Sequence, residues 1–120
     1  MPRDKRAYLS DIIVSCEAIE EAIANLDLSS YEKNRLVRSA VEREFIIIGE
    51  AMSALSRRAP ELFAAIHNAR RTIDFRNQLT HEYPNVDDTI VWAIADRDVP
   101  VLRHECEALL AGLNPQGETD

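Results

Sequence analysis

The chain contains little glycine, proline or cysteine, and each shortage narrows the choice of fold. Only three of the 120 residues are glycine and five are proline, and long stretches contain neither. Because both residues interrupt helices, their scarcity favours long helices. Cys16 and Cys106 are the only cysteines, so a disulfide-rich scaffold is excluded. We expect two reduced, buried thiols, although a single disulfide between them stays open.

Long apolar runs and the common cofactor motifs are also missing. No apolar segment approaches the roughly 20 residues that a membrane-spanning helix needs. Residues 1–5 are charged and lack the apolar segment of a secretory signal, which predicts a cytoplasmic protein without a membrane partner. There is no glycine-rich phosphate loop, CxxC pair or HExxH motif. His67 and His104 have no partner at metal-ligand spacing and are expected on the surface. We therefore predict no metal and no cofactor.

The rest of the composition is that of one soluble domain. Hydrophobic residues make up 46% of the chain and charged residues 29%, which is typical of a globular protein. A chain of this length forms a single domain by default. We predict one helical domain over residues 1–113 and a flexible tail over residues 114–120, because Gly112 and Pro115 end the last helical pattern.

Apolar residues recur every three or four positions, which is the spacing of one helix face. Ser29 and Glu32 form a capping-box pattern that predicts a helix start, and Pro60 ends that helix after Arg58. Pro100 either kinks the last helix or starts a new one. The predicted helices cover residues 4–26, 29–58, 60–66, 69–82 and 86–110. The predicted fold class is all-α, an antiparallel bundle of four main helices plus a short extra helix.

Gly49 lies in the middle of the longest predicted helix. Glycine at such a position costs about 1 kcal/mol relative to alanine. Close approach of another helix is the preferred explanation, ahead of contact with a ligand. Trp92 is expected to be a core residue rather than a platform for stacked bases.

The charges are unevenly distributed along the chain, whose net charge is −7. Residues 1–30 carry three basic and six acidic groups (−3), residues 31–76 nine and six (+3), and residues 77–120 two and nine (−7). An acidic protein is an unusual partner for nucleic acid. The basic middle, which includes Arg57, Arg58, Arg70 and Arg71, leaves open whether these arginines contact a phosphate backbone or are simply solvated.

The segment from Asp74 to Pro84 has too many polar groups for an ordinary buried helix. Its Arg76 offers a rigid fork of donors suited to phosphate, and His81 can accept and donate a proton near neutral pH. Together they could cleave an RNA phosphodiester without a metal, the histidine moving a proton and the arginine stabilising charge on phosphorus. On a straight helix, five steps of about 100° separate them by roughly 140°.

Two arrangements would bring these groups together. The end of the helix could loosen and swing His81 round, or two copies of this helix could meet across a two-fold axis and pool their side chains. We favour the second arrangement. Considered without any context, an arginine and a histidine on a helix are more often a solvated face or a satisfied core pair.

Arg76-Asn77-Gln78-Leu79-Thr80-His81-Glu82-Tyr83 resembles the R-N-x-x-x-H-x-Y signature of the HEPN superfamily, specifically its HepT-like toxins. Residues 42–51 resemble the family's second helix. Val86-Asp87, Val91-Trp92 and Asp98-Val99-Pro100 resemble its C-terminal part. The resemblance covers about residues 8–110, and the three segments in this order are specific to the family.

The resemblance implies a homodimeric bundle that acts as a metal-independent endoribonuclease, the toxin of a toxin–antitoxin pair. Arg76 and His81 match the family's catalytic positions, and Asn77 matches their polar companion. The implied partner is a nucleotidyltransferase antitoxin of the MNT type, which in some pairs attaches AMP to the tyrosine corresponding to Tyr83. Pro84 directly after Tyr83 is a departure from the expected pattern.

Two other functions are compatible with the same residues. The chain could be a catalytically inert module that binds a nucleotide or substrate for a nucleotidyltransferase. It could also be an interaction bundle whose polar helix is only a dimer interface. Loss of RNA cleavage in a His81 variant separates the enzyme from both alternatives.

Overall fold

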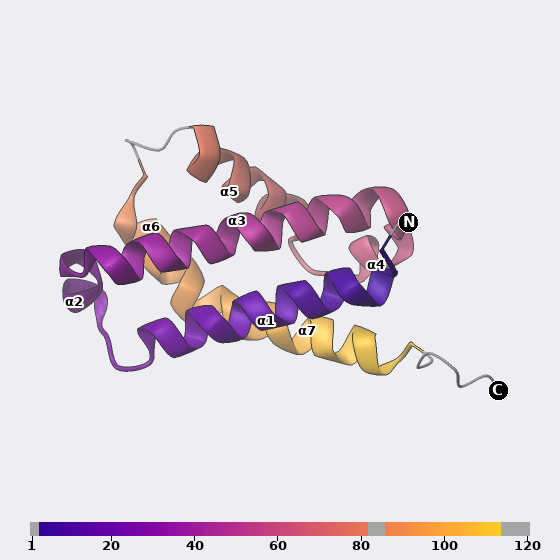
Figure 1. The fold of residues 1–120 in the computed structure, drawn as a ribbon, viewed down its shortest axis with the longest axis horizontal. Coiled ribbons are helices and arrows are strands. Elements are labelled where there is room, and N and C mark those ends of the chain that lie inside the picture. The colour runs from indigo at the N-terminus through magenta and orange to yellow at the C-terminus, as the bar shows by residue number, and fades with distance from the viewer. Residues whose placement is uncertain (1–2, 82–85, 114–120) are drawn as a thin grey trace.

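The computed structural model describes residues 3–81 and 86–113, which form helices and contain no strand (Figure 1). The helices are α1 (Lys5–Ile23), α2 (Leu28–Lys33), α3 (Arg35–Arg58), α4 (Pro60–Ala65), α5 (Ala69–His81), α6 (Asp88–Ala93), the π-helical turn η2 (Ile94–Asp98) and α7 (Val99–Ala111). The all-α prediction is confirmed. The predicted tail, residues 114–120, lies outside the described residues.

The long helices lie side by side in the order α5, α3, α1, α7, with neighbours running in opposite directions (Figure 1). Buried side chains from all four fill the interior, and the largest fully buried ones are Tyr31, Leu9, Ile12, Ile19, Ile48, Met52 and Leu55. Trp92 is partly buried against this core and its ring is 5.4 Å from that of Tyr31, so its expected structural role is confirmed. No helix among the described residues is long and apolar enough to cross a membrane.

The predicted unbroken helix over residues 29–58 is wrong. The chain leaves the helical conformation at Asn34, whose φ of −110° and ψ of 91° separate α2 from α3. The Asn34 side chain accepts a hydrogen bond from the backbone N–H of Val37 at 3.1 Å and so caps α3. An asparagine side chain can compete with the helix for backbone groups in this way, which the apolar pattern does not reveal.

The predicted capping box at Ser29 and Glu32 is also wrong. The cap of α2 is Asp27, whose carboxylate accepts from the Ser30 N–H at 2.8 Å while the Asp27 N–H donates to the Ser30 hydroxyl at 2.9 Å. The reciprocal bonding is that of a capping box, but it begins two residues earlier and uses serine where glutamate was expected.

Of the two alternatives predicted for Pro100, the start of a new helix agrees with the structure, because α7 begins at Val99 directly after Asp98. The helical conformation continues from α6 through η2 into α7, with Pro100 in the first turn of α7. A proline ring clashes with the carbonyl four residues earlier and supplies no N–H. The wider π turn before Pro100, in which the Val99 N–H donates to the Ile94 carbonyl, accommodates the ring.

The prediction of a close helix approach at Gly49 is confirmed. Gly49 is buried where α3 packs against α5. A Cβ atom added there would lie 2.2 Å from the Cβ of Arg76 and 2.6 Å from its Cγ. Carbon atoms in contact are normally 3.5–4.0 Å apart, so only glycine allows this packing.

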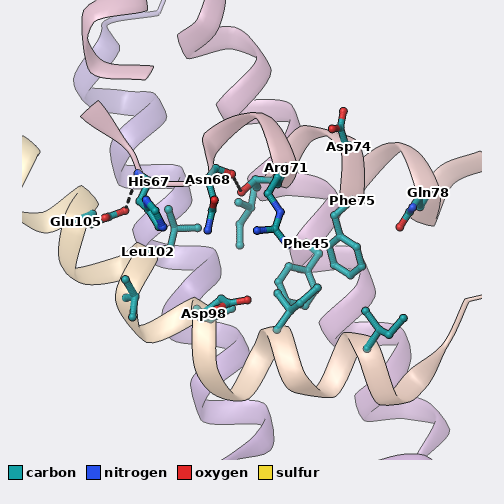
Figure 2. A pocket seen from close by; sticks show the side chains of 16 residues that line it. Phe45, His67, Asn68, Arg71, Asp74, Phe75, Gln78, Asp98, Leu102 and Glu105 are labelled. Atoms are coloured by element: carbon teal, nitrogen blue, oxygen red, sulfur yellow. Dashed lines mark hydrogen bonds between the residues drawn. The ribbon is translucent and has the colours of Figure 1, made fainter. Parts of the chain in front are cut away.

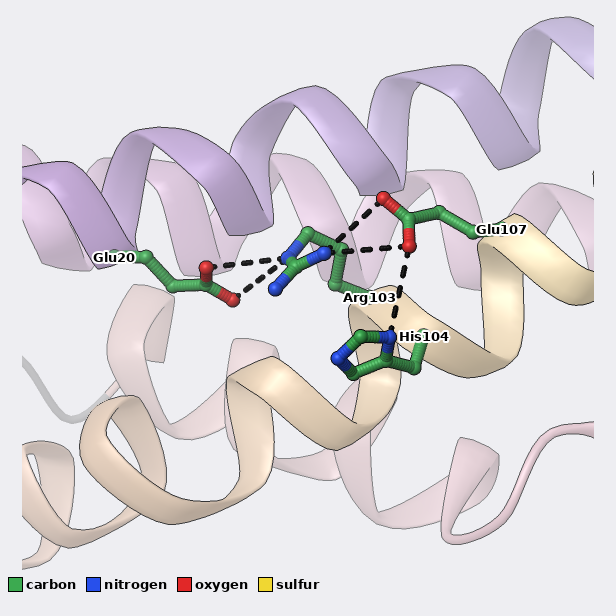
Figure 3. Close-up of polar contacts among 4 residues, drawn as sticks. All are labelled: Glu20, Arg103, His104 and Glu107. Carbon is green, nitrogen blue, oxygen red and sulfur yellow. Dashed lines mark hydrogen bonds and ion pairs between the residues drawn. The ribbon is translucent and has the colours of Figure 1, made fainter.

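An ion-pair network joins α1 to α7, the first and last helices of the bundle (Figure 3). The Arg103 guanidinium on α7 donates to both carboxylate oxygens of Glu20 on α1, at 2.9 and 3.1 Å, and to those of Glu107 at 3.2 Å. These hydrogen bonds raise the pKa of Arg103. His104 is exposed, as predicted, and lies 3.7 Å from Glu107.

Both cysteines are free, fully buried thiols, as preferred from the sequence. Burial raises the pKa of Cys16, and it raises the pKa of Cys106 to about 12. A thiol that stays protonated near neutral pH is a poor nucleophile and a poor metal ligand. The two cysteines therefore act as small core residues.

Candidate active site

Helix α5 presents the predicted site residues. It begins after Asn68, which has a φ of 60°, a left-handed conformation that asparagine tolerates better than most residues. The gap between the predicted helices over residues 60–66 and 69–82 is therefore confirmed. Ala69, Ile73 and Leu79 anchor α5 to the rest of the bundle because they are its buried residues. Arg76 is partly buried on this anchored side, whereas Asn77 and His81 are exposed.

Arg76 and Asn77 are held together by a direct hydrogen bond. The Arg76 Nε donates to the Asn77 Oδ1 at 2.8 Å. One turn later, the Thr80 hydroxyl donates to the backbone carbonyls of Arg76 and Asn77, both at 3.1 Å. The supporting role predicted for Asn77 therefore has a geometric basis, since Asn77 orients the guanidinium without neutralising it.

Beyond its bond to Asn77, the Arg76 guanidinium has no side-chain partner among the residues that the structure describes. Within residues 3–81 and 86–113, no carboxylate forms an ion pair with Arg76 and its Nη atoms make no hydrogen bond. A guanidinium offers up to five N–H donors in a fork that matches a phosphate. A partly buried arginine with one neutral partner is thus suited to hold a negatively charged group.

His81 is the last residue of α5 and remains within its regular helical turn. The loosened helix end that could have swung His81 round towards Arg76 is therefore not seen at this residue. None of the side-chain hydrogen bonds between described residues links His81 to Arg76 or Asn77. A single chain thus joins Arg76 to Asn77, whereas His81, five residues after Arg76, lies roughly 140° from it around the helix. Tyr83 lies outside the described residues.

Of the basic residues in the central segment, Arg57, Arg58, Arg70 and Arg71 are exposed. Arg57 donates to the Ser53 hydroxyl at 3.0 Å, and the Arg70 guanidinium lies 5.3 Å from the centre of the Phe63 ring. His67 is exposed, as expected. The described residues contain no group of three or more metal-ligating side chains.

A cavity of about 550 Å³ lies on the other side of α5, between α5 and the segment from α6 to α7 (Figure 2). The Phe45 and Phe75 rings meet there edge to face, 5.1 Å apart, and the Arg71 side chain extends over the cavity (Figure 2). The sequence did not single out this cavity. Its lining includes neither Arg76, Asn77 nor His81, so this cavity is separate from the predicted catalytic residues.

Sequence comparison identifies the family of the chain. Residues 12–109 match the family model described as "Ribonuclease HepT-like". The chain belongs to the HepT-like family. This confirms the resemblance that the Arg76–Tyr83 signature suggested.

Related HepT-like proteins occur in archaea and bacteria. The chain is 32% identical to "Putative RNase MJ1380" of Methanocaldococcus jannaschii over 88% of this chain and 95% of that protein. It is 31% identical to "Probable ribonuclease HepT" of Thermococcus cleftensis over 91% and 98%. It is 28% identical to "Putative RNase TTE0752" of Caldanaerobacter subterraneus subsp. tengcongensis over 88% and 93%. No solved structure matches the chain significantly.

Proposed function

We propose that the chain is a metal-independent endoribonuclease. The observation that carries the proposal is the Arg76 guanidinium, which Asn77 orients and which no carboxylate among the described residues neutralises. Membership of a family described as ribonucleases supports the same activity. The bound anion would be the RNA phosphate that is cleaved.

The proposed reaction uses the ribose 2′-hydroxyl as the nucleophile. The 2′-oxygen attacks phosphorus, the bond from phosphorus to the 5′-oxygen breaks, and a 2′,3′-cyclic phosphate and a 5′-hydroxyl are left. The His81 imidazole removes the 2′ proton and passes it to the 5′-oxygen as that oxygen leaves. Arg76 stabilises the charge that grows on the non-bridging oxygens.

The reaction requires groups that one α5 helix holds apart. We propose that two chains form a homodimer in which the α5 helices meet, so that each cleft takes Arg76 from one subunit and His81 from the other. Each cleft then holds one imidazole, which acts first as base and then as acid. In this dimer, the polar side of α5, which carries few apolar groups, would face the second subunit.

Cleavage of a single-stranded RNA oligonucleotide in buffer with EDTA tests the proposed activity. We expect the wild-type protein to cleave it and to leave 2′,3′-cyclic phosphate ends, which mass spectrometry identifies. Binding without cleavage would instead favour the inert nucleotide-binding module. Products that carry 5′-phosphates would contradict a 2′-hydroxyl nucleophile.

We also propose that this ribonuclease is the toxin of a toxin–antitoxin pair in the cytoplasm, with an MNT-type nucleotidyltransferase as the antitoxin. Transfer of AMP from ATP to the Tyr83 hydroxyl would release pyrophosphate and add an anion to the segment that follows α5. A phosphate there would compete with RNA for Arg76. The proposal rests on the signature, in which Tyr83 follows His81 with one residue between them.

We expect purified AMP-modified protein to lose RNA cleavage. Incubation with the nucleotidyltransferase and ATP should add one AMP to wild-type protein and none to a Tyr83→Phe variant, as mass spectrometry would detect. The Tyr83→Phe variant should then keep cleaving RNA after the same treatment. Full cleavage by the AMP-modified wild-type protein would rule out this mode of neutralisation.

A further inference from the structure

Gly49 and Arg76 are in contact where α3 and α5 pack together. Gly49 is buried in the middle of α3, and the nearest atoms to its missing side chain are the Arg76 Cβ and Cγ. The Thr72 carbonyl, one turn earlier on α5, would lie 3.5 Å from the same point. One turn earlier on α3, the Phe45 ring meets that of Phe75. The first atoms of the Arg76 side chain therefore lie directly against the backbone of α3.

An alanine at position 49 would clash with Arg76, and rotating the Arg76 side chain cannot relieve this clash. An alanine Cβ at position 49 would lie 2.2 Å from the Arg76 Cβ, and this atom is fixed to the backbone of α5. Rotation about the first side-chain bond moves Cγ but leaves Cβ in place. An acceptable carbon–carbon distance thus requires α5 to move away from α3 by about an ångström or more.

We propose that Gly49 is a positioning residue for Arg76. Its missing side chain provides the space on α3 in which the Arg76 Cβ and Cγ lie, and this fixes where the guanidinium emerges beside Asn77. The catalytic consequence rests on the proposed ribonuclease function. If each cleft combines Arg76 with a histidine of the second subunit, a shift of α5 changes the distance between them. A misplacement of 1 Å can lower a reaction rate about 100-fold.

The structural part of the proposal can be tested without any RNA. The Arg76 Nε–H donates to Asn77, and its signal in a ¹H–¹⁵N spectrum can be assigned by its loss in an Arg76→Lys variant. We expect Gly49→Ala to move this signal. Gly112→Ala is the matched control, because an added Cβ there meets only backbone oxygens at 3.5 and 3.6 Å. The control should leave the Arg76 signal unchanged.

The catalytic part is tested by steady-state cleavage with the same two variants. We expect Gly49→Ala to lower kcat roughly 100-fold and to change KM by less than about threefold. Circular dichroism should show equal helix content in both variants. If Gly49→Ala only reduced the amount of folded protein, the cleavage rate would fall in proportion and the Arg76 signal would keep its wild-type position.

The outcomes separate this inference from the proposed function. If Gly49→Ala displaces the Arg76 signal but the wild-type protein never cleaves RNA, positioning is supported and the ribonuclease is overturned. An unmoved signal together with an unchanged kcat would overturn positioning alone. If Gly49→Ala does not fold, the wild-type protein decides, because a strong nuclear Overhauser effect is expected between the Gly49 α-protons and the Arg76 β-protons. Its absence would overturn the inference.

Discussion

Replacement of His81 by alanine is expected to lower kcat for RNA cleavage about 1,000-fold, because a positioned acid or base contributes roughly 10²- to 10⁴-fold. His81 is exposed at the end of α5, so the substitution should leave the fold intact and change the free energy of unfolding by less than about 0.5 kcal/mol. The measurement is single-turnover cleavage of a labelled RNA oligonucleotide in EDTA, with thermal unfolding recorded in parallel.

His104→Ala is the matched control for this experiment. His104 is also an exposed helical histidine, but it lies on α7 next to Glu107. We expect the control to cleave RNA at the wild-type rate. Undiminished cleavage by His81→Ala would remove the histidine from the mechanism.

Replacement of Arg76 by alanine is expected to lower kcat/KM about 100- to 1,000-fold, which is the usual effect of removing one donor to a developing oxyanion. Arg76→Lys keeps the charge but loses the fork and the Nε–H that donates to Asn77, so it should recover only part of the rate. Cleavage rates of the three proteins over a range of RNA concentrations separate the effect on kcat from that on KM.

Arg57→Ala controls for the loss of a positive charge. Arg57 is exposed at the end of α3 and donates only to the Ser53 hydroxyl among the contacts described. If Arg76 contributed only its positive charge, Arg57→Ala and Arg76→Ala would weaken RNA binding to a similar extent. Equal losses in Arg57→Ala and Arg76→Ala would therefore contradict a specific role for Arg76.

The sequence predicted helices best where packing alone determines them. The apolar spacing correctly gave α1 and an all-α fold, because α1 buries one face, and Pro60 correctly marked the start of α4. It missed the break at Asn34, since that break depends on a side-chain amide bonding the Val37 N–H and not on hydrophobicity. The π turn before Pro100 was missed for a similar reason, because it adjusts backbone bonding and leaves the apolar pattern almost unchanged.

The candidate site was predictable as a set of residues but not as a geometry. The signature singled out Arg76, Asn77 and His81, whereas the hydrogen bond between Arg76 and Asn77 is a property of the folded helix. The mid-helix position of Gly49 indicated that another helix comes close. Only the packing of α3 against α5 identifies Arg76 as the residue that it meets. No short sequence pattern indicates the second subunit, because a two-fold contact depends on the whole surface.

A subunit-mixing experiment tests most directly whether the two α5 helices share one site. Arg76→Ala and His81→Ala proteins should each be nearly inactive. After subunit exchange, which native mass spectrometry verifies, each mixed dimer would contain one complete cleft, with Arg76 from one chain and His81 from the other. We expect the mixture to regain about a quarter of the wild-type rate, because half of the dimers are mixed and each has one of its two sites. Verified mixed dimers that stay inactive would contradict the shared site.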